Sequence, residues 1–481
     1  MSDLRADRVG AESAGGASAV VVTRCAYRDE VDRTSGHRRP ALPTRPAAGR
    51  TRRPGSGHEQ PERTRRREGK MVFVRGETGP RSTPMPSTPT PVGVTTEAQE
   101  ELRGRVRELC ARFPDEYWRE RDRNREYPDA FVDALTAAGY LAVLIPTEYG
   151  GSGLGITEGS IVLEEINRSG GHSAGCHAQM YTMGALLKHG SEQQKKAYLP
   201  GIADGSIRLQ AFSITEPEAG SNTTDIRTTA IRDGDDYVIS GHKNWTSRIE
   251  QSDLALVLAR TSPRAEDLKD RTKGISLFLV DLRDVRRDEP DTLKVEPVRT
   301  MFNYATNEVR YNDMRVPASA LIGEEGQGFR YVLDGWNAER ILLAAEAVGD
   351  GYWFIDRATA YANERQVFGK PIGANQGVQF PLARAYAQVG AADLMRYRAA
   401  ALFDAGEKCG EQANLAKFLA SEASWQAGNA CLDTHGGYGF VDTWDVERKF
   451  RETRLYQVAP VNNNLVLAYV GQHVLGMPRS Y

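Results

Sequence analysis

The segment Ala211-Phe-Ser-Ile-Thr-Glu-Pro-Glu-Ala-Gly-Ser-Asn222 lies where the pattern of the chain changes. Before it, apolar residues recur at helical spacing, and Thr96 can cap the first helix. After it, short apolar or alternating runs bounded by Gly, Asp, Pro or Lys indicate strands. The segment itself has the composition of a loop, in which hydroxyls and the Ala219-Gly220 pair would allow a ligand close to the backbone. An ordinary connecting loop is the alternative.

The changes in pattern predict an α+β fold in three blocks. An N-terminal helical domain is expected at 95–210, with helices at 96–113, 131–138, 159–167 and 192–201. A middle β-barrel or β-sandwich domain is expected at 211–320, with strands at 237–240, 254–259, 275–280 and 309–316 and a hairpin loop at 262–273. A C-terminal four-helix bundle is expected at 321–481, with long helices at 328–363, 378–405 and 412–434.

The composition excludes several classes of protein. The chain has 481 residues, of which 40% are hydrophobic, so it can bury a core. It has no run of 18 or more apolar residues, which predicts that it does not span a membrane. A net charge of -2 gives no general argument for nucleic-acid binding. Five scattered cysteines without CxxC spacing favour a reducing cytoplasm and argue against a disulfide framework or a metal site.

The N-terminal segment differs from the rest of the chain. Residues 1–96 hold 18 Lys or Arg against 10 Asp or Glu, together with ten of the 23 prolines. Such a segment cannot bury enough apolar surface to fold, so 1–94 is predicted to be a disordered basic leader. We favour a dispensable leader, or a translation start at Met71 or Met85. A basic arm that touches nucleic acid or a membrane is the lesser alternative. The ten acidic residues argue against a transit peptide.

Three further segments carry residues that could meet a ligand, and each has a purely structural alternative. His242-Lys-Asn-Trp-Thr-Ser247 offers an aromatic ring and hydroxyls for a planar ligand, or a core Trp with edge hydroxyls. Arg365-Gln-Val-Phe-Gly-Lys-Pro-Ile-Gly-Ala-Asn-Gln376 offers an arginine for phosphate, or a polar loop between helices. Leu432-Asp-Thr-His-Gly-Gly-Tyr-Gly-Phe440 offers glycines for close backbone contact with a nucleotide, or a helix C-cap. None is a dinucleotide-binding GxGxxG motif after a strand.

In this order and spacing, the four segments resemble the acyl-CoA dehydrogenase family, and the resemblance covers 95–481. It implies FAD-dependent α,β-dehydrogenation of an acyl-CoA or acyl-carrier thioester, with an electron-transfer flavoprotein as electron acceptor. It also implies a cofactor site shared between subunits, and hence a homodimer or homotetramer. The matching positions are Phe212, Ile214, Thr215, Trp245 and Ser247 for the flavin ring; Arg365, Phe368, Gln376, Gly436 and Gly437 for the rest of FAD at the subunit interface; and Ser221, Arg340 and Tyr456 for acyl-CoA.

The reaction needs a base for the α proton, an acceptor for the β hydride, and donors to the thioester oxygen. Most family members carry the base in a Tyr-Glu-Gly-Thr segment near the C-terminus. The matching segment here is read as Leu455-Tyr-Gln-Val-Ala-Pro-Val461, with Gln457 in place of the Glu and Ala459 in place of a Thr that meets the flavin. A neutral amide cannot act as the base, although the backbone N–H of Gln457 could still donate to the thioester oxygen.

A carboxylate on the first long C-terminal helix is the predicted base. Val332, Trp336, Glu339 and Leu343 share one helical face, so Glu339 is an acid within an apolar stripe. From the residues alone, a salt-bridged glutamate is an equal alternative. In the isovaleryl- and long-chain subgroups of the family the base precedes an Arg on this helix, and the resemblance therefore implies Glu339, with Glu346 as the second choice.

Two other functions keep the same fold. The departure from the usual C-terminal segment leaves open a flavin oxidase or monooxygenase that uses O2. A non-catalytic family member that binds a thioester, or DNA through its basic leader, is the third possibility.

Overall fold

The computed structural model of the protein describes residues 95–262 and 270–479. The leader predicted for 1–94 and the centre of the hairpin loop predicted for 262–273 lie outside these residues. Everything described below belongs to one compact unit of the chain.

Six α-helices form the N-terminal part. At the start of the first, the Thr96 side chain accepts a hydrogen bond from the Gln99 N–H, and the Gln99 side chain accepts one from the Thr96 N–H. All four helices predicted in this part are confirmed, and two more lie between them. The six helices are α1 (Glu97–Cys110), α2 (Asp115–Asn124), α3 (Asp129–Ala137), α4 (Ile156–Arg168), α5 (Ala174–His189) and α6 (Glu192–Asp204).

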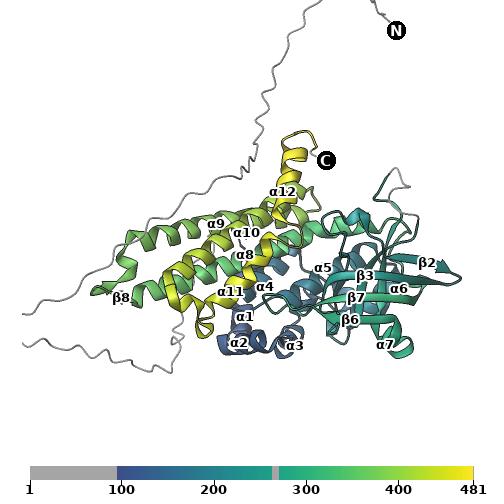
Figure 1. Cartoon of the computed structure of the whole chain (residues 1–481), viewed down its shortest axis with the longest axis horizontal. Helices are drawn as coiled ribbons and strands as arrows, with labels where there is room; N and C mark the ends of the chain where they lie inside the picture. Colours follow the sequence, from purple (N-terminus) through teal and green to yellow (C-terminus); the bar gives the residue numbers. More distant parts are fainter. Residues whose placement is uncertain (1–94, 263–269, 480–481) are drawn as a thin grey trace, which may run out of the picture. The chain divides into compact units, whose positions relative to one another are not determined.

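Seven strands form one sheet in the order β1-β4-β2-β3-β7-β6, and β5 also pairs with β4. Figure 1 labels β2, β3, β6 and β7 of this sheet. β1 runs parallel to β4, whereas β4–β5, β2–β3, β3–β7 and β6–β7 are antiparallel. The four predicted strands are confirmed within longer ones, and β1, β2 and β6 are additional. The strands are β1 (Leu209–Ser213), β2 (Thr229–Asp233), β3 (Asp236–Ser247), β4 (Leu254–Arg260), β5 (Ile275–Asp281), β6 (Leu293–Pro297) and β7 (Thr306–Pro317), and the short helix α7 (Leu282–Asp288) follows β5.

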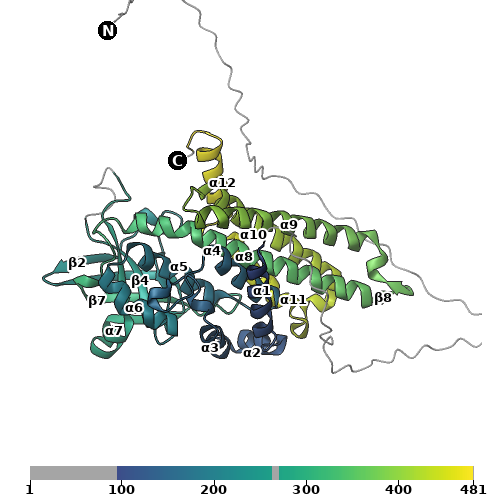
Figure 2. The ribbon, with the colours of Figure 1, turned by 180° about the vertical axis from the view of Figure 1, so that it is seen from behind.

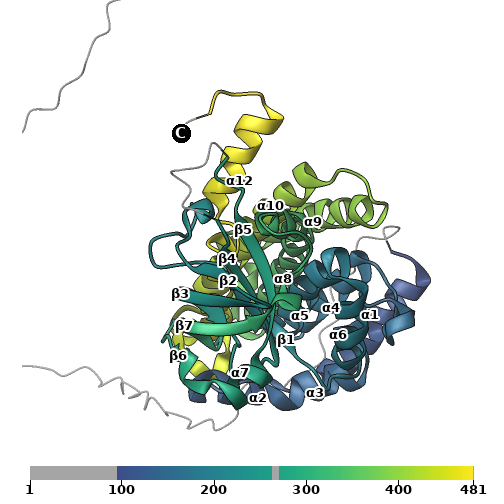
Figure 3. The same ribbon diagram turned by 90° about the vertical axis from the view of Figure 1, so that its right-hand side faces the viewer.

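Both faces of the sheet are buried where β4 and β5 pair. The leucines of β4 point to one side, where they pack against residues of α5 and α6. The alternate side chains of β4, which include Val257, point to the other side and pack against β3 and β7. Because strands of the same sheet line both sides of this second core, the sheet is curled, as predicted for the middle block (Figure 3).

Three long helices dominate the C-terminal part, and the predicted ranges of all three are confirmed. α8 packs against α9 and α10, and α4 from the N-terminal part packs against both α8 and α9 (Figures 1 and 2). No helix in the described part of the chain is long and apolar enough to cross a membrane. The helices are α8 (Gly328–Glu364), α9 (Gln376–Asp404), α10 (Gly410–His435), α11 (Val446–Thr453) and α12 (Asn463–Tyr469), and a hairpin of β8 (Gln366–Val367) and β9 (Lys370–Pro371) joins α8 to α9.

Candidate active site

A cavity of about 830 Å³ lies between the sheet, α5, α8 and the segment after α11. It gathers residues that are far apart in the sequence: the end of β1 and the loop after it, the end of β3, and one face of α8. Eight predicted site residues line it: Phe212, Ile214, Thr215, Ser221, Trp245, Ser247, Glu339 and Arg340.

Glu339 lies on the cavity wall with its side chain almost entirely buried, 5% exposed. Its carboxylate has no hydrogen-bond partner among the described residues, and Glu339 lines the cavity. Burial raises the pKa of Glu339 to about 7, against the opposing attraction of His177 and Arg340. A carboxylate with a pKa near neutrality can take up and release a proton under ordinary conditions.

Glu346 lies two helical turns further along α8 and is held differently. Its carboxylate oxygen lies 3.0 Å from Nδ1 of His177 and accepts a 2.7 Å hydrogen bond from the Ser173 hydroxyl. Burial tends to raise the pKa of Glu346, but attraction to His177 and these hydrogen bonds outweigh burial, so its pKa lies below the ordinary value. Two glutamates on one helix therefore have pKa values shifted in opposite directions.

The strand side of the cavity carries unusual backbone. Trp245 has a φ of +62°, in the left-handed region that residues with a side chain rarely adopt, and Arg248 has a φ of +59°. The Trp245 side chain is 56% exposed in spite of its size. Such backbone conformations persist where the surrounding structure imposes them, and they cluster at functional sites.

Two predicted residues near the C-terminus lie outside the cavity. Gln457 ends a 3-10 turn, and its amide donates a 2.9 Å hydrogen bond to Glu422. The hydroxyl of Tyr456 is buried and accepts a 2.8 Å hydrogen bond from Asn167. The cavity is lined instead by the five residues that follow, so the predicted roles of Gln457 at the thioester oxygen and of Tyr456 at the substrate are not supported by their positions. The lining residues are Val458, Ala459, Pro460, Val461 and Asn462.

The five positions predicted to meet FAD across a subunit interface do not line the cavity either. They lie at the ends of the long helices, in the β8–β9 hairpin and the turn after α10. All five are exposed, and Phe368 is 99% exposed. They are Arg365, Phe368, Gln376, Gly436 and Gly437.

Comparison with known proteins identifies the family. Sequence models of the acyl-CoA dehydrogenase N-terminal, middle and C-terminal domains match residues 96–206, 211–314 and 326–475. Acyl-CoA dehydrogenase FadE12 of Mycobacterium tuberculosis is 37% identical over 391 residues, which cover 81% of this chain and 98% of the relative. The chain belongs to the acyl-CoA dehydrogenase family.

Other members of the family show the same extent of similarity. The cyclohex-1-ene-1-carbonyl-CoA dehydrogenase of Syntrophus aciditrophicus is 33% identical over 79% of this chain and 90% of that relative. A solved structure of glutaryl-CoA dehydrogenase in complex with glutaryl-CoA matches with a TM-score of 0.74 at 28% identity, over 80% of this chain and 97% of that one. Family membership confirms the predicted fold class and makes the chain an oxidoreductase that acts on acyl-CoA, with FAD as the cofactor of the family.

The strand side of this acyl-CoA dehydrogenase cavity fits a flavin ring. The Asn244 Oδ1 atom is buried without a hydrogen-bond partner, directly beside the exposed indole of Trp245. The Thr215 and Ser247 side chains also line this side, and the Ser247 hydroxyl lies 2.9 Å from that of Thr306. A planar ring with polar edges would satisfy the unpaired amide and cover the exposed indole.

Several cavity residues were not predicted from the sequence. His177 and Tyr181 belong to α5, which the sequence pattern did not reveal. Gln210 and Arg248 directly adjoin predicted segments, and Tyr304 lies in the loop before β7. The positions of Gln210 and Arg248, directly next to predicted segments, were the signal that the sequence offered. Among the described residues, no group of three or more His, Cys, Asp or Glu side chains could hold a metal ion.

Proposed function

We propose that this protein oxidises an acyl-CoA thioester to the 2-enoyl thioester, with Glu339 as the base that removes the α proton. The supporting observation is the buried Glu339 carboxylate on the cavity wall, without a hydrogen-bond partner and with a pKa raised to about 7. A base of this kind is charged often enough to accept a proton and is poorly solvated, which makes the transfer efficient.

The residues around Glu339 have complementary roles. FAD, when bound, supplies the acceptor for the β hydride. Arg340, the next residue on α8, is half-buried on the cavity wall and favours the charged form of Glu339. Gln457 lies outside the cavity, Val458 and Ala459 donate their N–H groups to the Leu455 carbonyl, and Pro460 has no N–H. We therefore propose that the backbone N–H of Val461 or Asn462 donates to the thioester oxygen.

The environment of Glu346 argues against it as the base. Its hydrogen bonds with Ser173 and His177 stabilise the carboxylate, and a stabilised carboxylate is a weaker base. It is also absent from the residues that line the cavity. Glu346 therefore serves to hold His177 in place.

Anaerobic bleaching of the FAD-loaded protein by acyl-CoA thioesters tests this function. Glu339→Gln should retain FAD and lose bleaching, whereas Glu346→Gln should still bleach. Bleaching by Glu339→Gln at the wild-type rate would exclude Glu339 as the base, and the reverse pattern of the two variants would assign the base to Glu346.

The electron acceptor that we propose is an electron-transfer flavoprotein. A relative from Acetobacterium woodii, 31% identical over 354 residues, is named as the CarC subunit of a caffeyl-CoA reductase-Etf complex. The alternative is an oxidase or monooxygenase that uses O2; rapid reoxidation of the reduced protein in air would favour it. We assign the reaction to cytoplasmic fatty acid metabolism, in keeping with four free, buried cysteines in the described part of the chain.

We further propose that the protein is a homodimer or homotetramer, in which the helix ends of one subunit complete the FAD site of another. The support is the apolar surface that these ends expose: Phe368 is 99% exposed on the β8–β9 turn, and Phe440 is 72% exposed after α10. Large apolar side chains gathered on an exposed surface are typical of interfaces between proteins. Arg365 directly precedes the β8–β9 hairpin that carries Phe368, and Gln376 begins α9 after it; both would contact the cofactor from there.

A further inference from the structure

Arg248 is a buried arginine that lacks a counter-ion. It lines the cavity, is 5% exposed, and makes no ion pair with any carboxylate in 95–262 or 270–479. Its guanidinium carbon lies 4.8 Å from the centre of the Tyr304 ring, and Nη1 reaches the Tyr304 carbonyl only at 3.5 Å. Nε has no hydrogen-bond partner. A cation–π contact offsets only part of the free energy lost when a guanidinium leaves water.

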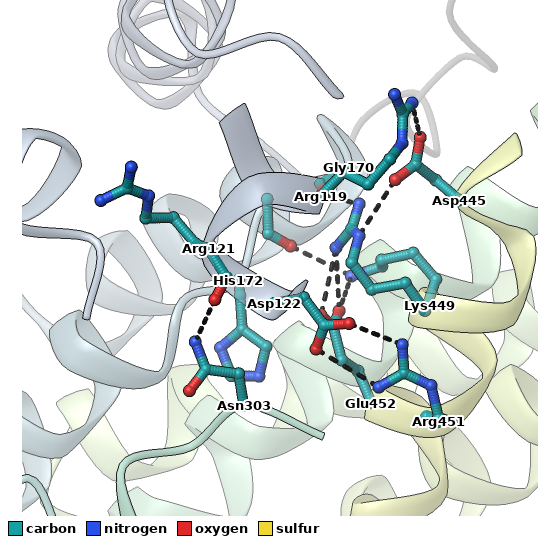
Figure 4. Close-up of polar contacts among 12 residues, drawn as sticks. Arg119, Arg121, Asp122, Gly170, His172, Asn303, Asp445, Lys449, Arg451 and Glu452 are labelled. Atoms are coloured by element: carbon teal, nitrogen blue, oxygen red, sulfur yellow. Dashed lines mark hydrogen bonds and ion pairs between the residues drawn. The ribbon is translucent and has the colours of Figure 1, made fainter. Parts of the chain in front are cut away.

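The carboxylates around Arg248 do not pair with it. Glu339 lines the same large cavity but forms no ion pair with Arg248. Arg248 also borders a smaller cavity of about 40 Å³, and the carboxylates that share this cavity are Asp122 and Glu452. Asp122 accepts a 2.7 Å hydrogen bond from Arg451, and Glu452 pairs with Arg448 at 3.1 Å and with Lys449 at 3.3 Å (Figure 4). These carboxylates are therefore committed to other cations and do not neutralise Arg248.

Other polar atoms on the cavity wall are also unpaired. Nε2 of His177 is buried without a partner, while Nδ1 of the same ring faces Glu346. Nε2 of Gln210 is buried without a partner, while Oε1 of the same amide accepts a 2.7 Å hydrogen bond from Tyr127. With Arg248, these groups give the wall one cation, one amide donor and an imidazole that donates when protonated. Buried donors are usually met by a protein group, a water molecule or a ligand, so these atoms are candidates for ligand contact.

The burial of the lining residues separates an open from a closed end of the cavity. Ser221 and Asn222 are exposed, and Asn462 donates a 3.2 Å hydrogen bond to Ser221 at this open end. Arg248 and Gln210 are buried, at 5% and 0% exposure, and we infer that the closed end of the cavity lies beside them. Because the CoA portion of a thioester is too large and polar to enter the closed end, the tail of the acyl chain must point there.

We propose that the closed end binds a carboxylate at the far end of the acyl chain, and that the substrates are ω-carboxyacyl thioesters. This inference rests on the proposed function. A carboxylate would pair with Arg248 and accept from Gln210, whereas a methyl end would leave the guanidinium buried and unpaired. An anionic oxygen or nitrogen at the edge of the bound cofactor could meet the same donors. The experiment below separates a carboxylate of the substrate from an anionic edge of the cofactor.

The test compares matched straight-chain acyl-CoA esters that end in a methyl group or in a carboxylate, with the FAD-loaded protein. Wild type should bleach at least about tenfold faster, at limiting concentration, with the carboxylate-ended ester, since a hydrogen bond to a charged group is worth about 1.5–3 kcal/mol. Arg248→Met should remove this preference, and Arg248→Lys should restore part of it. Arg286→Met is the control, because Arg286 donates to the carbonyls of Ile249 and Ser252 in the same loop without lining the cavity, and it should keep the preference.

Calorimetric binding of the 2-enoyl thioesters, which are not oxidised further, gives a second readout that does not depend on turnover. Tighter binding of the carboxylate-ended ester to wild type, lost in Arg248→Met, supports the proposal even where neither ester bleaches the flavin and the proposed function fails. If the wild-type protein does not distinguish the methyl-ended from the carboxylate-ended ester, the proposal is overturned, whether or not the variants fold. An Arg248→Met protein with altered FAD affinity and flavin absorption but an unchanged preference would assign Arg248 to the cofactor and also overturn it.

Discussion

Replacing Glu339 with Gln should stabilise the protein at alkaline pH. Burial raises the pKa of this carboxyl from its ordinary value of 4.5 to about 7, so above neutrality the folded protein holds a charge that would be better solvated in the unfolded chain. Each tenfold change in an acid dissociation constant is worth about 1.4 kcal/mol, so a rise of this size corresponds to about 3 kcal/mol. Gln has nearly the same shape and carries no charge, so Glu339→Gln should recover most of this free energy.

The direction with pH follows from proton binding. Between pH 4.5 and about pH 7 the folded protein holds a proton on Glu339 that the unfolded chain has released, so the free energy of unfolding falls as pH rises. Below this range both states are protonated, and the substitution should have little effect. Above it the penalty is complete, and the variant should have the full advantage over wild type.

Thermal unfolding of the FAD-loaded proteins, followed by tryptophan fluorescence at equal FAD concentration, measures this difference. The midpoint of Glu339→Gln should match that of wild type below about pH 5 and exceed it by several degrees above about pH 8. A midpoint difference that is the same at both pH values, or a variant that is less stable at alkaline pH, would refute the buried and unpaired state of Glu339.

Glu346→Gln provides a matched control on the same helix with the opposite expectation. Its pKa is lowered in the folded protein because His177 and Ser173 stabilise the carboxylate, so this carboxylate contributes stability above its unfolded pKa that is lost in acid. Glu346→Gln should therefore lower the midpoint at neutral and alkaline pH. If Glu339→Gln raises the unfolding midpoint at alkaline pH and Glu346→Gln lowers it, the surroundings of each carboxylate, and not the residue type, determine the change in stability.

Three further predictions concern catalysis, assembly and stability. The rate of flavin bleaching at limiting substrate should rise with pH and level off above about pH 7, because only the charged form of Glu339 accepts a proton; a flat profile in stopped-flow measurements would contradict this. Phe368→Asp should produce smaller species in light scattering and release FAD on ultrafiltration, and an unchanged mass with full FAD content would exclude Phe368 from the interface. Arg103→Met should lower the free energy of unfolding by about 3 kcal/mol in urea titrations, because it removes the two hydrogen bonds of 2.9 and 3.0 Å that the buried Glu164 accepts from Arg103. Arg105→Met, which breaks an exposed pair with Glu101 on the same helix and a contact with Tyr140, should change it by less than about 1 kcal/mol.

The helices that were found from the sequence are those with one buried and one exposed face. α1 has a capping box at Thr96 and a single apolar stripe, so the cap and the spacing of the apolar residues both predict a helix there. α5 was missed because most of its residues are buried on all sides, which removes the contrast between faces on which a helical period depends. α2 was missed for the opposite reason, because nearly all of its side chains are polar and only Trp118 is buried.

The predicted site residues that line the cavity on its strand side lie next to strand ends, where residue type and backbone geometry act together. The hydroxyl and aromatic residues around Thr215 and Trp245 adjoin strand ends, and a strand end fixes where its neighbours point. Gln457, which was predicted to donate its backbone N–H to the thioester oxygen, ends a short 3-10 turn and does not line the cavity. Spacing alone does not determine which of these residues faces a cavity that distant helices close.

Arg248 shows a second kind of limit. It follows Ser247 directly, and a charged residue after a strand is ordinarily exposed. It is buried because α5 and the loop before β7 lie against it. It forms no ion pair with Glu339 on the same cavity wall, and Asp122 and Glu452 are bound to Arg451, Arg448 and Lys449. Whether a cation lacks an ion-pair partner depends on the folded structure. The contacts of each neighbouring carboxylate have to be known before the cation can be called unpaired. A residue whose role depends on its side-chain type can therefore be predicted from a sequence motif. A residue whose role depends on a buried charge without an ion-pair partner can be recognised only in the folded structure.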